Sequence, residues 1–246
     1  MGNSSPRHVV TYHPSEGFFS PRVKREEYDV VSTPDYPFSK IPTFKRWYPD
    51  GQINVEGNLG GYYREWHRNG NPKMEGTIDA RGRFKGTRTE WHPDGKVRVV
   101  AEFKRDKAVR ILSLCDELGR DCLLPDGEQI VWKACITNPD KKNKVGVYVK
   151  IMVPKEAGRV TPIDTDNTYK SRISHGVVLA IESEDGKQYD SAVSFVYTRE
   201  RLTYVVGERV AFDPDDFDDD LGVECGAGIN VHRYRDQCTK WFRSNR

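Results

Sequence analysis

The chain has 246 residues, of which 36% are hydrophobic and 31% are charged. This length suits one large domain or two small domains, each able to bury a core. No apolar run approaches the roughly 20 residues of a membrane-spanning helix, and the amino terminus lacks a secretory signal. We therefore expect an intracellular protein that is neither secreted nor inserted in a membrane.

The cysteines and the charges add two further constraints. Five cysteines without a CxxC pair favour a reducing compartment and give little support to a structural zinc site. Residues 41–111 hold 15 Lys and Arg against 9 Asp and Glu, whereas residues 112–246 hold 19 against 23. The sequence therefore predicts an electropositive first half and an acidic second half.

The leading segment, residues 1–40, contains five prolines and no steady hydrophobic period. We expect an irregular, extended N-terminal arm over this range. Two alternatives stay open for it, docking along the sheet that follows or free disorder.

Residues 41–120 repeat one short phrase of aromatic residues, turn residues and glycine. RWYPDG ends at Gly51, EWHRNG at Gly70, EWHPDG at Gly95, and the looser CDELG at Gly119. Pro-Asp-Gly suits a type I turn followed by a glycine with positive φ, and the flanking residues alternate as half-buried strands do. The recurrence indicates β-hairpins stacked into one elongated sheet, since a single hairpin is marginal in water.

The segment WYPDGQINVEGNLGGYYREWHRNGNPKMEG resembles the MORN-repeat family, in the variant whose units carry a second glycine six residues after the first. Ala101 replaces this second glycine in the third unit, and CDELG lacks the tryptophan. The resemblance implies protein–protein contacts, a homodimer formed through the repeat sheet and, in some members, binding to an anionic membrane surface. It implies no catalysis, and we expect no catalytic residue, metal or cofactor.

Aromatic and basic side chains of the repeats are the candidate binding residues. Together they predict a groove for a peptide, an acidic partner or lipid headgroups. The alternative is that these aromatic residues form the core of a thin sheet under arginine stems. Nucleic acid is a weaker candidate, because the charge excess is modest and no recognition helix is present. The candidate residues are Trp47, Tyr62, Tyr63, Trp66, Trp91, Arg64, Arg68 and Arg88, accompanied by Arg46, Arg83, Phe84 and Lys85.

Residues 121–246 contain apolar, β-branched runs separated by turn residues. They predict a compact antiparallel β domain with a short helix at Arg235–Phe242. VYVKIMVPKEAGRVTP, YVVGERV and ECGAGINVHRYRDQC resemble a C-terminal domain of unknown function found in large DNA viruses. With the repeats, the whole resembles marseillevirus-type giant-virus proteins. This implies an interaction protein that binds a host or viral protein in the infected cell (cytoplasm, viral factory or nucleus) or in the virion.

Three thiols and one histidine near the C-terminus suggest chemistry that we consider the lesser alternative. Cys225, His232 and Cys238 have a spacing that zinc ligands can have, with Cys122 or Cys135 as a fourth ligand. Cys225 and His232 are also a conceivable nucleophile and base. Because INVHRY alternates as a strand does, we expect His232 to be half exposed and the thiols to be buried.

The run Asp213–Asp220 puts six aspartates in eight residues. Its spacing does not match the calcium loop of an EF-hand. A docking loop for a basic partner is an alternative, and we expect a solvated loop.

Overall fold

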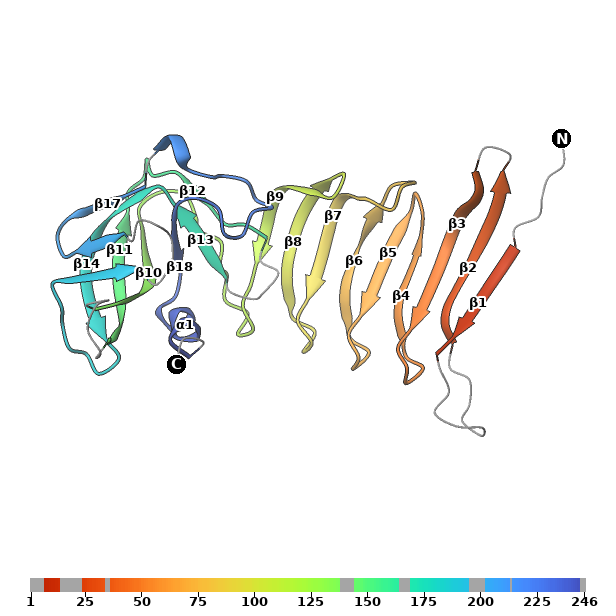
Figure 1. Cartoon of the computed structure of the whole chain (residues 1–246), viewed down its shortest axis with the longest axis horizontal. Coiled ribbons are helices and arrows are strands. Elements are labelled where there is room, and N and C mark those ends of the chain that lie inside the picture. The colour runs from red at the N-terminus through yellow and green to blue at the C-terminus, as the bar shows by residue number, and fades with distance from the viewer. Residues whose placement is uncertain are drawn as a thin grey trace. The chain divides into compact units, whose positions relative to one another are not determined.

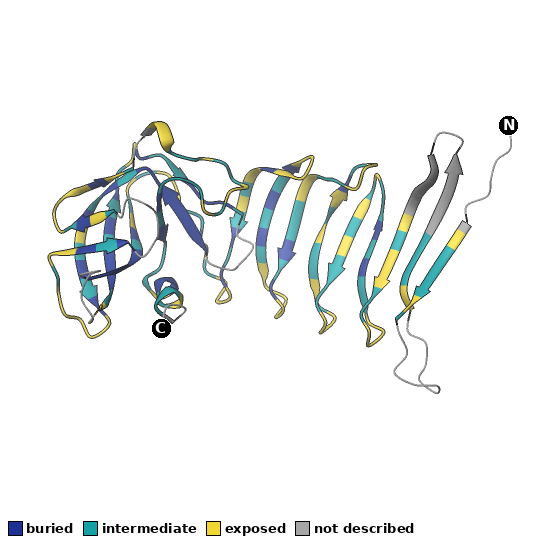
Figure 2. Ribbon diagram, viewed as in Figure 1, coloured by how far each residue is buried: buried dark blue, intermediate teal, exposed yellow. Residues whose placement is uncertain are grey.

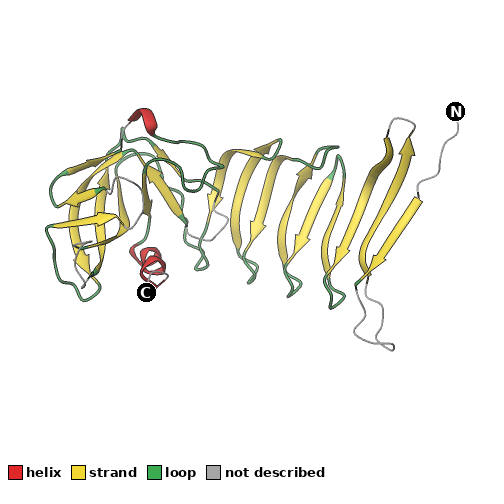
Figure 3. Cartoon of the chain, viewed as in Figure 1, coloured by secondary structure: helices red, strands yellow, loops and turns green. Residues whose placement is uncertain are grey.

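The computed structural model describes residues 7–13, 24–33, 36–137, 144–163, 169–194, 202–212 and 214–243. The chain forms two compact units, one of residues 1–113 with 117–119 and one of residues 114–116 with 120–246. Both units consist mainly of β-strands, as the sequence predicts (Figure 3). No helix in the described residues is long and apolar enough to cross a membrane.

The first unit contains a nine-stranded sheet, which we call the repeat sheet, whose strands follow one another in chain order (Figure 1). Each strand is hydrogen-bonded to the next one in the sequence, which confirms the predicted array of hairpins. The strands are β1 Arg7–Tyr12, β2 Lys24–Thr33, β3 Tyr36–Trp47, β4 Ile53–Asn58, β5 Tyr62–Trp66, β6 Pro72–Ile78, β7 Phe84–Trp91, β8 Val97–Lys104 and β9 Lys107–Leu114.

The repeated glycines occupy the same corner of successive hairpins. Gly51, Gly70 and Gly95 have φ angles of 89°, 84° and 88°. Each donates its backbone N–H to the carbonyl oxygen three residues earlier, at 2.9 Å. This geometry is the predicted type I turn with a left-handed glycine. Gly119, with φ of 79°, shows that the looser fourth phrase also contains a positive-φ glycine.

The described residues before position 41 are more regular than the expected irregular arm. β1 pairs antiparallel with β2, and β2 with β3, so these strands extend the repeat sheet. The backbone hydrogen bonds of a neighbouring strand can order such a segment without a periodic side-chain pattern. Residues 1–6, 14–23 and 34–35 of the expected arm lie outside the described residues.

The second unit, which we call the C-terminal domain, is built on a sheet whose strand order differs from chain order. The path runs β12-β13-β18-β10-β11-β14-β17, while β15 pairs with β10 and β16. Its strands are β10 Gln129–Ile136, β11 Gly146–Val153, β12 Arg159–Val160, β13 Lys170–Ile173, β14 His175–Ser183, β15 Ser191–Ser194, β16 Thr203–Val205, β17 Arg209–Ala211 and β18 Ile229–His232.

Short helices complete the C-terminal domain. They are the 3-10 turns η1 Pro214–Asp216 and η2 Arg235–Cys238, and the helix α1 Thr239–Arg243, which confirms the predicted helix. One face of the sheet forms a core of valine and isoleucine side chains. Figure 2 marks many residues along the strands of this sheet as buried. A second, smaller hydrophobic cluster contains Ala134 and Tyr148, and Trp241 and Phe242 of α1 pack against it.

The acidic run is folded around a buried arginine rather than simply solvated. Arg172 is fully buried, and its guanidinium donates to the carbonyl oxygens of Asp218 at 2.9 Å and Asp220 at 3.1 Å, and to that of Val223. The Asp218 carboxylate lies 3.7 Å from the same guanidinium. Asp215, Asp216 and Asp219 are exposed, as expected of a solvated loop, and Asp213 lies outside the described residues. The expectation is wrong for Asp218 and Asp220, because the sequence pattern does not reveal a partner on a distant strand.

Candidate interaction surface

The repeated tryptophans are the last paired residues of their strands. Trp47 pairs with Ile53, Trp66 with Pro72, and Trp91 with Val97. Just before each pair, the register skips one residue of the partner strand, which places a bulge at the same point of three hairpins. Because the extra residue lies in the partner strand, the tryptophan-bearing strands keep their regular alternation over Lys45–Trp47, Arg64–Trp66 and Thr89–Trp91.

This alternation places the three tryptophans on one side of the repeat sheet, which we call the tryptophan face. Two contacts support the assignment. The Arg64 guanidinium lies 5.7 Å from the Tyr62 ring centre, and Lys24 Nζ lies 5.6 Å from that of Trp47. The tryptophan face comprises Lys45 and Trp47 of β3, Glu56 of β4, Tyr62, Arg64 and Trp66 of β5, Glu75 of β6, and Thr89 and Trp91 of β7.

Charges of alternating sign run across the tryptophan face beside the indoles. Lys45 Nζ lies 3.9 Å from the Glu56 carboxylate, and the Arg64 guanidinium lies 4.0 Å from Glu56 and 3.9 Å from Glu75. Such exposed pairs contribute little to stability, but they neutralise one another. The expected electropositive repeat surface is therefore wrong for this face, because the sequence does not show which charges the register brings together.

Hydrogen bonds from one repeat fix the tryptophan backbone of the next. Tyr48 Oη donates to the carbonyl oxygen of Trp66 at 2.7 Å, and His67 Nε2 bonds that of Trp91 at 2.9 Å. His13 Nε2 bonds the carbonyl of Trp47 at 2.9 Å. The three indole N–H groups themselves bind no acceptor within the described residues. The row of half-buried rings is thus rigidly spaced, while its donors stay available.

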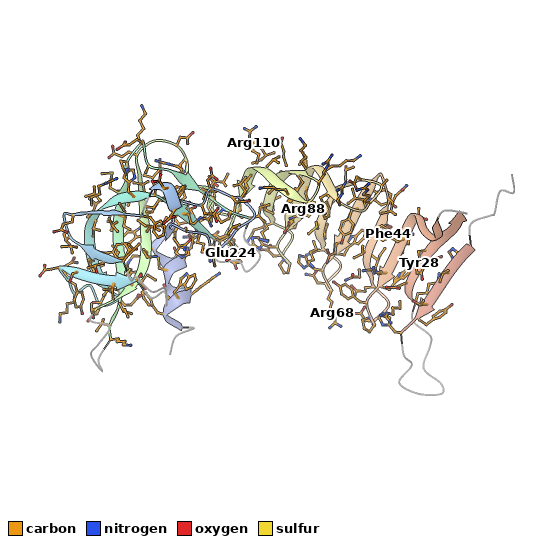
Figure 4. All side chains as sticks on the ribbon, turned by 45° about the horizontal axis from the view of Figure 1, so that its top comes forward. Tyr28, Phe44, Arg68, Arg88, Arg110 and Glu224 are labelled. Atoms are coloured by element: carbon orange, nitrogen blue, oxygen red, sulfur yellow. The ribbon has the colours of Figure 1, made fainter. Side chains whose placement is uncertain are left out.

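The opposite side of the repeat sheet, which we call the glycine face, carries a row of packed aromatic rings. Ring centres of Phe44 and Tyr63 lie 6.3 Å apart, those of Tyr63 and Phe84 5.1 Å, and those of Phe84 and Phe103 6.1 Å. Figure 4 labels Phe44 of β3, at one end of this row, and Arg88 of β7. The second glycine of each repeat makes room for them. A Cβ on Gly57 would lie only 2.5 Å from the Phe44 ring.

Arg88 explains why alanine replaces that glycine in the third repeat. Ala101 is paired with Arg88, whose guanidinium carbon lies 4.9 Å from the Phe84 ring centre and 3.9 Å from that of Phe103. Burial lowers the pKa of Arg88, and the Glu90 carboxylate at 2.6 Å opposes that shift. A stacked arginine thus takes the place that a ring occupies over Gly57, and a methyl group fits beneath it.

The structure divides the predicted binding residues among three places. Tyr63 and Arg88 lie on the glycine face, where burial and then Glu65 raise the pKa of Tyr63 to about 12. Arg68 is exposed in a turn, 5.7 Å from the Tyr48 ring centre. The tryptophan face holds the other five, Trp47, Tyr62, Arg64, Trp66 and Trp91. Sequence reasoning missed Lys45 as a candidate. Lys45 and Arg64 both stand two residues before a tryptophan, and this shared position is the signal that identifies Lys45.

Cys225 and His232 do not contact each other. Cys225 Sγ accepts a hydrogen bond from Lys170 Nζ at 3.1 Å, while His232 Nε2 accepts one from Trp241 Nε1 at 2.9 Å. His232 is only 4% exposed whereas Cys225 is exposed, so the expected half-exposed histidine and the expected burial of this thiol are both wrong. Burial, aided by Lys133 and Lys170, lowers the pKa of His232 to about 3. A nucleophile–base pair of these two residues is thus not supported.

The cysteines proposed as alternative metal ligands are dispersed. Cys135 lies in the main core of the C-terminal domain and Cys238 in the cluster beneath α1. Cys122 accepts a hydrogen bond from Gln237 at 3.1 Å. In the described part of the chain, no group of three or more His, Cys, Asp and Glu residues is placed to hold a metal ion.

Comparisons with known proteins agree with the division into repeats and a second domain. Residues 85–105, which contain Trp91 and Gly95, match the MORN repeat variant. Residues 120–238 match a family of unknown function (DUF5758). No curated protein and no solved structure shows significant similarity to the chain.

Proposed function

We propose that this chain is a non-enzymatic interaction protein whose tryptophan face binds a protein partner. One observation supports this most directly. Trp47, Trp66 and Trp91 recur at the same point of successive hairpins, on a face that no second layer of the described first unit covers. Aromatic side chains with an apolar body and a polar N–H are enriched at the energetic centres of protein interfaces.

The charge pattern favours a protein over an anionic membrane or a nucleic acid. Polyanions are bound by an excess of Lys and Arg, with affinity that falls steeply as salt rises. On the tryptophan face, Lys45 and Arg64 each have a carboxylate within 4.0 Å. A protein partner can complement alternating charges, whereas a uniform polyanion meets Glu56 and Glu75 as well.

The side chains of the tryptophan face also explain why we propose binding without catalysis. They offer indole rings, one phenol, a threonine hydroxyl and charges that pair with each other. Nucleophilic catalysis requires a nucleophile held next to a base, and the face contains no such arrangement among its described side chains. Its chemistry is stacking and hydrogen bonding.

A capture experiment with variants of the two faces tests the proposal. Partners are captured from lysate with the unaltered chain, with Trp66→Ala/Trp91→Ala, and with the glycine-face control Phe44→Leu/Phe84→Leu. We expect the tryptophan variant to lose partners that the control retains, with circular dichroism confirming that both remain folded. Equal retention by the two variants would contradict the proposal.

We further propose that the partner is a host or viral protein met during infection. The resemblance of the C-terminal domain to a domain of large DNA viruses supports this setting. Following the tagged protein through an infection tests it. Accumulation at a viral factory, in the host cytoplasm or in the virion is expected, and absence of expression throughout infection would contradict it.

A further inference from the structure

The tryptophans of the repeat sheet have a spacing that matches one particular peptide conformation. They lie on β3, β5 and β7, so neighbouring tryptophans are two strands apart. With strands about 4.8 Å apart, this spacing is about 9.6 Å. A polyproline II helix rises about 3.1 Å per residue with three residues per turn, giving a pitch of about 9.3 Å.

From this match we propose that the tryptophan face binds a proline-rich segment in the polyproline II conformation, lying across the strands. The inference rests on the proposed function and specifies its ligand. One edge of the helix returns to the same orientation once per turn, so every third residue meets one indole. Proline rings stack on the flat indoles, and the ligand is already extended before it binds, which lowers the entropy cost of binding.

Other regular conformations are out of phase with the tryptophan row. In an extended strand, three residues span about 10 Å, but the third residue points to the opposite side because side chains alternate. In an α-helix, about 9.6 Å corresponds to between six and seven residues, which is not a whole number of turns. Only the threefold helix combines the right rise with the right orientation.

The free indole donors match the acceptors of such a ligand. A polyproline II segment makes no internal hydrogen bonds, so its carbonyl oxygens remain available. The N–H groups of Trp47, Trp66 and Trp91 have no acceptor within the described residues. The bonds that hold the Trp66 and Trp91 carbonyls keep the donors at a fixed period. Each turn of the ligand therefore finds one ring and one donor.

Although the charges of the tryptophan face pair with one another, the cations of the first two repeats are more exposed than the carboxylate between them, which favours acidic residues in the ligand. Lys45 and Arg64 lie two residues before their tryptophans, and their side chains are 49% and 55% exposed. Glu56 between them is only 19% exposed. The third repeat has Thr89 at this position, and Glu75 beside it is 54% exposed. An acidic residue at every third ligand position is thus favoured over the first two repeats.

Peptide titration with the full chain tests this inference. A peptide of repeated Pro-Pro-Glu is compared with repeated Gly-Ser-Glu, which has the same charge spacing without the threefold helix, and with repeated Pro-Pro-Lys. We expect binding of Pro-Pro-Glu, with Gly-Ser-Glu weaker by about tenfold or more, since one indole hydrogen bond and one stacked ring are each worth about 1 kcal/mol. Pro-Pro-Lys should also bind more weakly than Pro-Pro-Glu, because its ammonium groups meet the exposed cations Lys45 and Arg64. Trp66→Phe, which keeps a ring but removes the donor, should weaken binding about fivefold.

The controls separate failure of this inference from failure of the proposed function. Tyr63→Phe on the glycine face should leave the affinity for Pro-Pro-Glu unchanged. Equal binding of Pro-Pro-Glu and Gly-Ser-Glu, or binding that Trp66→Phe does not change, would overturn the polyproline inference. If no proline-rich peptide binds while protein capture still depends on Trp66 and Trp91, the inference falls and the proposed function stands. If that capture is also independent of the tryptophans, both fall.

Discussion

The repeat sheet and the C-terminal domain reach a β-structure by opposite routes. In the repeat sheet every strand pairs with its sequence neighbours, so each hairpin repeats the turn and the ring packing of the one before. In the C-terminal domain β18 lies between β13 and β10, which are far from it in the sequence. Local sequence determines the first architecture, whereas long-range contacts determine the second.

Buried polar side chains show the same difference. The C-terminal domain buries Lys133, Lys170, Arg172 and His232, each bonded to a residue far along the chain or to the helical segment. Between Ile53 and Ser113 the repeat sheet buries few polar side chains and relies on aromatic rings over glycines. A substitution of a buried polar residue should thus destabilise the whole C-terminal domain. A substitution in the repeat sheet should destabilise only the neighbouring hairpins.

Replacing the buried arginine of the C-terminal domain should have the largest effect. Arg172→Met removes the donor to the carbonyls of Asp218, Asp220 and Val223 and should cost about 3–5 kcal/mol in free energy of unfolding, measured in urea. Arg209→Met, at an exposed position, should change it by less than about 0.5 kcal/mol. Equal losses of unfolding free energy in the two variants would show that Arg172 does not hold the segment 218–223.

The buried histidine should make the C-terminal domain sensitive to acid. Because the pKa of His232 is about 3 in the folded state and ordinarily about 6.5, the unfolded chain binds the extra proton between these values. The stabilisation is complete above pH 6.5 and falls by about 1.4 kcal/mol per pH unit down to pH 3. In His232→Gln, whose amide oxygen can still accept from Trp241, the slope between pH 6 and 4 should flatten. An unchanged slope would assign it to other groups.

Filling the space under a ring should act locally in the repeat sheet. Gly57→Ala places a Cβ against the Phe44 ring and should cost about 1–3 kcal/mol. Phe44→Leu in the same chain should recover part of this loss by removing the clash. Hydrogen exchange should show faster opening confined to β3–β5. Uniformly faster exchange through β9 would mean that the sheet opens as one unit.

The smallest effect is expected from the bond between adjacent repeats. Tyr48→Phe removes the hydrogen bond to the Trp66 carbonyl and should cost about 1 kcal/mol, again limited to neighbouring hairpins by hydrogen exchange. Tyr62→Phe serves as the control, since Tyr62 is exposed and its hydroxyl has no such bond. A larger loss in Tyr62→Phe would contradict the role given to the hydrogen bond between Tyr48 and the Trp66 carbonyl.

The sequence predicts the turns and hairpins well because their causes are local. A glycine with positive φ after Pro-Asp or Arg-Asn specifies Gly51, Gly70 and Gly95 without any distant contact. The division of candidate residues between two faces also follows from alternation, but the charge pairs do not, since bulges set the register.

Long-range packing limits what the sequence shows elsewhere. Alternation correctly separates His232 from Ile229 and Val231, yet it does not show that Trp241 of α1 covers the histidine. Likewise, nothing in the acidic run indicates that Arg172, on β13, lies beneath residues 218–223.

Site-specific photo-cross-linking tests most directly whether the tryptophan face is where a partner binds. A photoreactive amino acid is placed at position 64 on that face or at position 46 on the glycine face, where the arginine side chains are 55% and 54% exposed. We predict a cross-link to a captured partner from position 64 and none from position 46. Cross-links from position 46 alone, or equally from both, would contradict the assignment.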